Sequence, residues 1–501
     1  MASEHYQHDE ARRMIFGLKY SCLRDFGRDG SIASQVAGRP RHLMLAALTI
    51  VFALSVLGLP SASAQVAVKA GLVVPIVGEP IENGVILINE GKIEAVGKDL
   101  KIPVDYKVVQ ADDGVVMPGL IDPHSSDGMS QANEQNTNVP FLSVVDSIDP
   151  NAPYFEQCRR NGVTTAAVVP GNSTMIGGRS AIVKTSGGYV NDMVLVQDAG
   201  LKISLRPIRG SRMSHLARLR RELDVAKRSI EDEIAEEKEK EEKEKAEAKK
   251  SSEKSEKPKE GEEKKDEKKD PPKEGEAKDE KSDGDDKKEE DKKPEEEEAE
   301  SLRQLKRLLR GEQEAFVYCD AAMDVAQAIT LSRQYGFKAR LVLSSDCYKA
   351  AELLADTDAT VVLDPELVFW ETDPRTREDK KIVVSRLMHD EDVDFVFQAN
   401  LGSSPQSVGS GYFWFQAATA ISYGMDRGEA LERLTLAPAK LLGIDEFVGS
   451  IEPGKDADLV IYSGDPLKID SWVMKTMVAG EVVYDRDKDD KLKRLLEEPK
   501  S

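Results

Sequence analysis

The stretch from Met117 to Gly128, MPGLIDPHSSDG, places one histidine at the end of an apolar run. Side chains two residues apart in a strand point to the same face. A second histidine two positions after His124 would therefore present two imidazoles together, which is a good start for a divalent-metal site. That position is Ser126 instead. The pattern leaves open whether a metal is lost, is held by other ligands, or was never needed.

The segments around this stretch predict an α/β fold. Eight strand-like runs alternate with helical runs, a pattern typical of parallel β/α units. The strand-like runs are GVVMPGLID, TTAAVVPG, SAIVKTSG, LKISL, AFVYCD, ARLVLSS, ATVVLDP and VDFVFQAN. We expect a closed (β/α)8 barrel of the TIM type over residues 118–448, with reactive groups at the carboxyl ends of its strands. A doubly wound open sheet is the second interpretation, but no glycine-rich phosphate loop follows the first strand.

Two β-rich segments flank the barrel. Residues 66–117 contain VILI and IEAVG around the turn NEGK, which indicates a hairpin. Residues 449–485 contain DADLVIYSG and WVMKTMVAGEVVYD, again short apolar runs around turns. These segments predict one small β-sandwich built from both ends of the chain, and residues 486–501 read as a charged tail.

The net charge of −21 is concentrated in one insertion. Residues 231–300 hold 33 acidic and 20 lysine side chains, so −13 of the net charge lies there. Without apolar residues to bury, most of this segment is expected to be disordered, although its first part contains the i,i+4 Glu–Lys pairs of a solvated helix. Since no basic stripe appears in the folded part, we expect no nucleic-acid partner.

The N-terminal region, 1–64, has the pattern of a signal peptide behind a long leader. Arg39 and Arg41 precede an apolar run from Leu43 to Leu59, and Ala62 and Ala64 form a small-residue cleavage site. This predicts export to the periplasm or the extracellular space, with no stable membrane span after cleavage. An uncleaved anchor is the alternative, because the run is near the lower length limit for a span.

Three cysteines follow the cleavage site: Cys158, Cys319 and Cys347. Their odd number and the lack of a CxxC spacing argue against a disulfide framework and against a cysteine zinc site. We expect three buried free thiols, with a Cys319–Cys347 bond as the alternative.

Several motifs together resemble the amidohydrolase superfamily, specifically its imidazolonepropionase-like branch. They are PGLIDPH, GVTTAAVVPGNSTMIGGRSAIVKTSG, LARLRRELDVAK, ALERLTLAPAKLLG and GSIEPGKDADLVIYSGDPL, and the similarity runs from about Val66 to Asp485 outside the insertion. The resemblance implies metal-dependent hydrolysis of non-peptide C–N bonds in cyclic amides, with one divalent metal, zinc in this family, as cofactor.

Carried over residue by residue, the resemblance implies a degenerate metal centre. The first-strand pair falls on His124 and Ser126, the strand-five histidine on Tyr318, and the strand-six histidine on Ser344 or its neighbour. The strand-eight aspartate, the family's catalytic base, falls on Asn400. Of the other histidines after the cleavage site, His215 and His389 are expected at helix or surface positions.

The favoured interpretation is a noncatalytic member of the family, without a cofactor, that binds a small molecule at the barrel mouth. Asn133, Glu134, Arg179 and Lys184 are the residues expected to line that mouth. The family's tendency to form homo-oligomers is a further expectation.

Two alternatives remain from the sequence. The first is an active C–N hydrolase whose metal site is rebuilt from His124 and nearby acids, which are Asp127, Glu134, Asp320 and Asp346. The second is a structural or interaction protein that acts through the charged insertion.

Overall fold

The computed structural model describes residues 65–254, 292–357, 359–399, 401 and 411–497. The expected signal peptide, the centre of the charged insertion at 255–291, and Asn400 lie outside the described residues. Among the described helices, none is long and apolar enough to cross a membrane.

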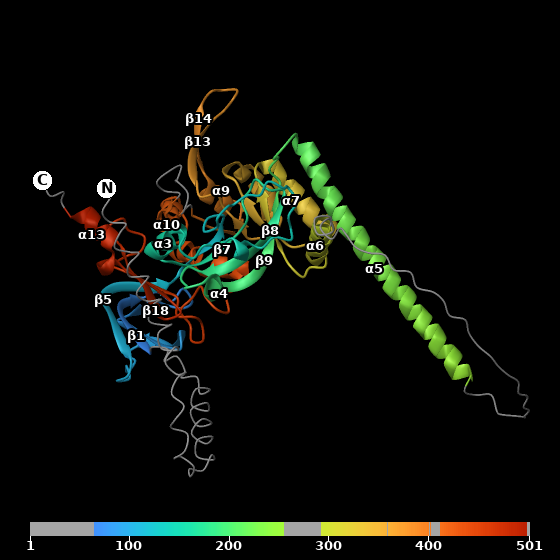
Figure 1. Ribbon diagram of the computed structural model, residues 1–501. Helices are drawn as coiled ribbons and strands as arrows, with labels where there is room; N and C mark the ends of the chain where they lie inside the picture. The colour runs from blue at the N-terminus through green and yellow to red at the C-terminus, as the bar shows by residue number, and fades with distance from the viewer. Residues whose placement is uncertain (1–64, 255–291, 358, 400, 402–410, 498–501) are drawn as a thin grey trace, which may run out of the picture. The chain divides into compact units, whose positions relative to one another are not determined.

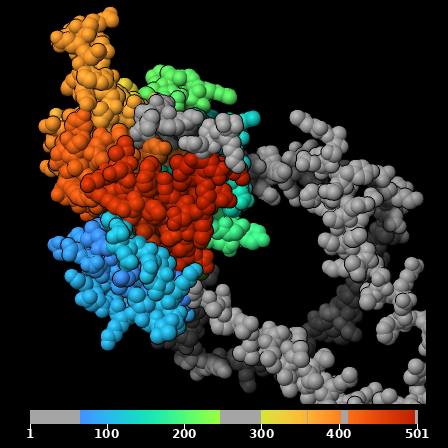
Figure 2. Space-filling view, turned by 90° about the vertical axis from the view of Figure 1, so that its left-hand side faces the viewer, coloured from blue at the N-terminus to red at the C-terminus, as the bar shows by residue number. Residues whose placement is uncertain are grey.

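The first of two large sheets joins both ends of the described chain. Its strand order is β18-β17-β16-β5-β1-β3-β4, with β2 paired to β1. Its strands are β1 (Val66–Val73), β2 (Ile81–Glu82), β3 (Gly84–Asn89), β4 (Lys92–Lys98), β5 (Lys107–Pro118), β16 (Leu459–Tyr462), β17 (Val473–Val478) and β18 (Glu481–Asp485). The joint is the antiparallel pairing of β5 with β16, and Figure 2 shows the N-terminal strands in blue against the C-terminal segments in red. Segments 66–117 and 449–485 therefore form one β unit, as predicted.

The second sheet is the wall of the barrel. Its order is β15-β12-β11-β10-β9-β8-β7-β6. Its strands are β6 (Leu120–Ser125), β7 (Val163–Val168), β8 (Ile176–Lys184), β9 (Val194–Ser204), β10 (Ala315–Cys319), β11 (Ala339–Leu343), β12 (Val361–Val362) and β15 (Phe395–Val396). Each of the eight predicted runs contributes one of these strands.

The direction of β8 differs from the prediction of parallel β/α units. β8 pairs antiparallel with both β7 and β9, whereas the other neighbours in this sheet are parallel. Only residues 169–175 connect β7 to β8, which is too short for the helical crossover that a parallel pair requires. As a result, the start of β8 lies at the barrel end where its neighbours finish, and Lys184 lies at the opposite end.

Contacts link the first and last strands of the sheet, although no strand pairing joins β6 to β15 among the described residues. The backbone N–H of Ala399, just after β15, donates to the Asp122 carboxylate on β6. Helix α12 (Leu436–Leu442) contacts both strands. Inside the ring, Ile121, Phe316 and Val342 pack with side chains of α12 in one buried cluster.

Helices cover the outside of the barrel and the rim (Figure 1). They are α3 (Pro153–Arg160), α4 (Val190–Met193), α7 (Ala322–Tyr335), α8 (Ala351–Ala355), α9 (Val384–Asp390), α10 (Phe413–Ser422) and α11 (Arg427–Glu432), with α13 (Asp490–Leu496) in the tail. A hairpin of β13 (Val368–Thr372) and β14 (Asp379–Val383) projects beside α10.

The charged insertion is framed by two helices, α5 (Arg212–Lys254) and α6 (Lys292–Leu309). Leu219 and Leu223 of α5 and Leu305 and Leu308 of α6 are buried in the main core. Surface i,i+4 pairs such as Lys245–Glu241 follow, as expected for a solvated helix. Helical structure therefore extends further into residues 231–300 than predicted, from both sides. Each helix is held at the end away from the insertion by leucines that are buried in the core.

Candidate functional site

His124 lies at the carboxyl end of β6, inside the ring, with 6% of its surface exposed. Its Nδ1 is 3.1 Å from Oε1 of Gln398, and its Nε2 is 3.1 Å from Nζ of Lys202. Because an amide oxygen only accepts, Nδ1 must carry the proton, so the lone pair of Nε2 accepts from Lys202. Burial and the neighbouring lysine keep the pKa of His124 well below its usual value.

Lys202 is a fully buried lysine on β9. Its Nζ donates to Oδ1 of Asn172 at 2.6 Å and lies 5.4 Å from the centre of the Tyr318 ring. Burial lowers the pKa of Lys202 to about 7. The amine thus joins side chains from three barrel strands and one loop at the centre of the barrel's carboxyl end.

The side chains present do not fit the divalent metal of the resembled family. The Nε2 lone pair that a metal would need is used by Lys202. At the matched positions, Ser126 offers a poor zinc ligand, and burial raises the pKa of Tyr318 well above its usual value, so its phenolate is disfavoured. Ser344 is also engaged, since its hydroxyl donates to the Asp320 carbonyl at 2.7 Å.

The acids considered for a rebuilt metal site are spread over separate contacts. Asp320 pairs with Arg206 and Arg212, and Asp346 pairs with Lys349 at 2.5 Å. Asp127 lies near Asp122, whose pKa it helps to raise. Across the described parts of the chain, no three His, Cys, Asp or Glu side chains are grouped as metal ligands would be.

Asn133 and Glu134 lie on the loop after β6, which contacts the loop that follows β7. Oδ1 of Asn133 accepts from the Ser173 backbone N–H at 2.7 Å, and the Glu134 backbone N–H donates to the Thr174 hydroxyl at 3.1 Å. This second loop also carries Asn172, the partner of Lys202. The structure therefore brings these two predicted residues close to the His124 centre, although it uses them to hold the loops together.

Arg179 and Lys184 are not brought to that centre. Arg179 on β8 forms an ion pair with Asp198 at 2.8 Å. Lys184 is buried at the other end of the barrel, where Nζ lies 2.7 Å from Asp458 and 3.0 Å from Asp456. Burial alone would lower the pKa of Lys184, but the two carboxylates raise it. The expectation that Lys184 lines the mouth does not match its position, because β8 runs in the reverse direction.

Asp122 forms a second buried polar group behind the His124 strand. The Tyr154 hydroxyl donates to its Oδ2 at 3.0 Å. Burial raises the pKa of Asp122 to about 8. Tyr154 and Cys158, both on α3, lie close to this carboxyl group, so the Tyr154 hydrogen bond ties β6 to the helix that covers it.

Asp364, two residues after the end of β12, is a further acid at the carboxyl end of the barrel. Its Oδ1 accepts from the Glu366 backbone N–H at 2.9 Å. Burial raises the pKa of Asp364 to about 6. The negative charge of Asp364 helps to raise the pKa of Tyr318. Asp364 therefore lies on the same side of the barrel as the His124 centre.

The remaining predicted groups have structural contacts. His215 lies in the first turn of α5, a helix position as expected, but it is fully buried, and its Nε2 lies 2.9 Å from the carbonyl oxygen of Ser204. His389 lies in α9, 3.7 Å from Glu429. The three thiols are free and buried, as predicted.

Sequence reasoning missed four polar residues of this centre: Asn172, Lys202, Asp364 and Gln398. A signal existed for Lys202, since it is the one charged residue in the apolar run LKISL. A lysine in a buried strand is rare unless it has a partner inside. No comparable signal marks Asn172 or Gln398, because amides in loops are common.

Comparisons with known proteins agree with this architecture. The sequence profile described as Amidohydrolase family matches residues 411–484. A solved amidohydrolase from Thermotoga maritima MSB8 is 24% identical, with a TM-score of 0.63, over 84% of this chain and 100% of that one. The chain therefore has an amidohydrolase fold, and its C-terminal segment is similar in sequence to the amidohydrolase family.

Curated relatives match only part of their own length. Amidohydrolase tasK from Hapsidospora irregularis is 22% identical over 80% of this chain and 40% of its own. Adenine deaminase from Rubrobacter xylanophilus is 36% identical over 16% of this chain and 13% of its own. The chain thus shares the fold of the Thermotoga protein and spans less than half of the length of each of these two relatives.

Proposed function

We propose that this chain is an exported amidohydrolase-superfamily protein, of the imidazolonepropionase-like branch, that binds a small molecule at the barrel mouth without hydrolysing it. The observation that carries the proposal is the 3.1 Å contact between Lys202 Nζ and His124 Nε2. The amine occupies the lone pair through which the retained imidazole would coordinate a metal.

The chemistry of the superfamily supports this reading. A catalytic zinc site normally uses three protein ligands and one open position for water. Here one matched histidine remains, and it is committed to Lys202. Asn400, at the position of the catalytic aspartate, is neutral and cannot accept a proton from water. Hydrolysis would lack both its metal ligands and its base.

The same side chains favour a ligand that carries carbonyl or carboxylate oxygens. Lys202 supplies N–H donors, and Asn172 fixes one of them at 2.6 Å. The centre of the Tyr318 ring lies 5.4 Å from the amine and offers an aromatic face beside it. A cyclic amide fits this set, because its carbonyl oxygens accept hydrogen bonds while its ring packs on tyrosine.

The test combines metal analysis with binding. Protein from zinc-supplemented medium is analysed for metal, and hydantoin, a cyclic amide, is titrated by calorimetry and then recovered. We expect well under one zinc per chain, measurable binding and unchanged hydantoin, with weaker binding by Lys202→Met. Lys440→Met, on exposed α12 surface, serves as the matched control. Near one equivalent of tightly held zinc, with hydantoin turnover that His124→Ala abolishes, would reverse the proposal.

A further inference from the structure

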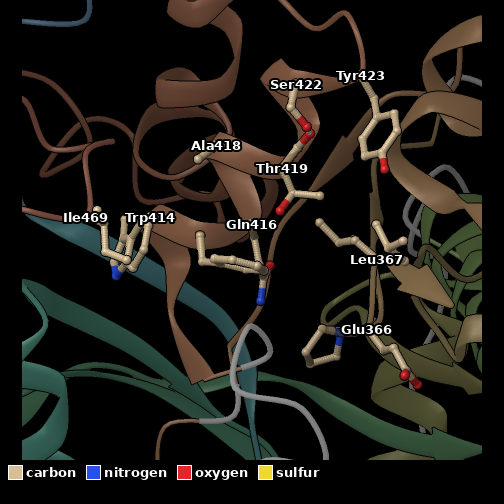
Figure 3. A pocket seen from close by; sticks show the side chains of 12 residues that line it. Glu366, Leu367, Trp414, Gln416, Ala418, Thr419, Ser422, Tyr423 and Ile469 are labelled. Atoms are coloured by element: carbon tan, nitrogen blue, oxygen red, sulfur yellow. Dashed lines mark hydrogen bonds between the residues drawn. The ribbon is translucent and has the colours of Figure 1, made fainter.

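A separate pocket lies outside the ring, between α10 and the segment that enters the β13–β14 hairpin. Its volume is about 620 Å³, within the usual range for small-molecule sites. Leu367 and Tyr423 lie on one side of the pocket, Trp414 and Ile469 lie on the other side, and Gln416 lies between them (Figure 3). His124, Lys202 and Tyr318 are not among its lining residues. The pocket is therefore distinct from the centre described above.

One polar side chain in this apolar pocket lacks a partner. Gln416 is 1% exposed, and its Oε1 has no hydrogen-bond donor within the described structure. Its Nε2 donates to the Gln398 carbonyl at 2.6 Å. Because that carbonyl only accepts, it fixes the orientation of the amide, so Oε1 must be the free atom. A buried acceptor left unpaired lowers the stability of the folded chain, so a donor supplied by a ligand would be favoured at this atom.

We propose that this pocket binds a small, neutral, aromatic molecule that carries one N–H donor, of which indole is the simplest example. The apolar walls would bury the ring, and the N–H would pair with Oε1 of Gln416. An aromatic ring also matches Trp414 and Tyr423, which favour offset or edge contacts with rings. The site is independent of the proposed function, so either can fail alone.

The experiment compares indole with 1-methylindole, which has the same ring but no N–H donor. Affinities are measured by ligand-observed NMR on the full chain. We expect indole to bind about tenfold more tightly, as expected for about 1.4 kcal/mol. Gln416→Met keeps the length of the side chain and removes the acceptor, so it should abolish the preference. Ala418→Trp should weaken both ligands by filling the pocket.

Gln327→Met provides a matched control on α7, where Gln327 accepts from Arg220. It should leave the preference for indole unchanged. The proposal is overturned if the wild-type chain binds both molecules equally or neither of them. It is also overturned if Gln416→Met retains the preference, or if Ala418→Trp changes the oligomeric state and not indole binding, which would make this face a contact between copies.

Discussion

His124 and Lys202 show how a single neighbour changes the chemistry open to a histidine. An imidazole needs a free lone pair to bind a metal. With Nδ1 protonated toward Gln398, only Nε2 is left, and Lys202 lies there at 3.1 Å. Restoring the missing ligands alone would therefore leave the first ligand blocked.

Zinc affinity tests this reading. Ser126→His, Tyr318→His and Asn400→Asp together restore three of the four family donors that the resemblance places at altered positions, but we expect weak zinc binding while Lys202 remains. Adding Lys202→Ala should raise the affinity by about tenfold or more, a typical effect of changing a group beside a metal ligand. Competition with a fluorescent chelator measures it. Equal affinity with and without Lys202 would show that the amine does not block the site.

Asp364 should make stability depend on pH. Its pKa is raised to about 6 in the folded state, so between about pH 4 and 6 the folded chain binds more protons than the unfolded chain. The free energy of unfolding therefore falls as the pH rises through this window, by up to about 3 kcal/mol for two pKa units. Asp364→Asn should remove this fall.

Urea unfolding at pH 4 and pH 7 checks the prediction for Asp364. Relative to the wild type, the Asp364→Asn variant should have a higher free energy of unfolding at pH 7 than it has at pH 4. Exposed Asp470→Asn is the control and should show no such change. Parallel pH profiles for Asp364→Asn and wild type would contradict the expectation.

At this scale the sequence predicted part of the centre. His124 could be placed at a strand end because its apolar run is local. Lys202 could not be joined to it, since inward and outward positions alternate along LKISL and only the closed ring decides which face is inside. Asn172 and Gln398 meet His124 and Lys202 only through that same ring closure.

Among the elements, β8 depends on a buried ion pair. Lys184 lies between Asp456 and Asp458, with 10% of its side chain exposed. Lys184→Met should destabilise the chain by about 3–5 kcal/mol, because it leaves a buried carboxylate without its partner. Lys69→Met is the matched control, since its pair with Asp112 is about half exposed; it should change stability by about 0–1 kcal/mol. Similar unfolding free energies for the two variants would argue against this role.

The charged insertion should be removable. In the part of the insertion whose side chains are described, no apolar residue is buried over residues 234–245 of α5 or 299–303 of α6. Replacing residues 240–298 by a short Gly-Ser linker should shift the melting temperature by only a few degrees. A deletion that also removes Leu305 and Leu308 should unfold the chain. Limited proteolysis of the full chain should cut within 255–291, and resistance there would count against the composition argument.

The eight strands were predictable because each is a short apolar run bounded by turns. The reversal of β8 was not, since apolar composition is the same for either strand direction. The reversal could be read only from the seven residues that separate β7 from β8, because so short a connection favours an antiparallel pair whatever its residue types.

For the whole molecule, a thiol count tests both burial and processing. Cys158, Cys319 and Cys347 are buried, and burial raises the pKa of each thiol, to about 11 for Cys347. The folded chain should therefore react negligibly with a disulfide reagent at pH 8. After denaturation, three thiols should react if the leader has been removed, and four if Cys22 remains. Fast reaction before denaturation, or four thiols in secreted protein, would contradict burial or cleavage respectively.

The reversed strand also bears on how the barrel folds. β7, β8 and β9 are linked by short connections and pair with their neighbours in sequence. Their contacts are therefore local, whereas β9 reaches its next neighbour β10 only across α5, the insertion and α6. Contacts between residues close in sequence lose little chain entropy when they form, so folds that are rich in such contacts fold fastest. We therefore expect this meander to form first, which would place Lys202 in the core before most of the ring exists. Early folding of β7, β8 and β9 would then bury the Lys202 amine before the later strands could leave it on the outer face of the barrel.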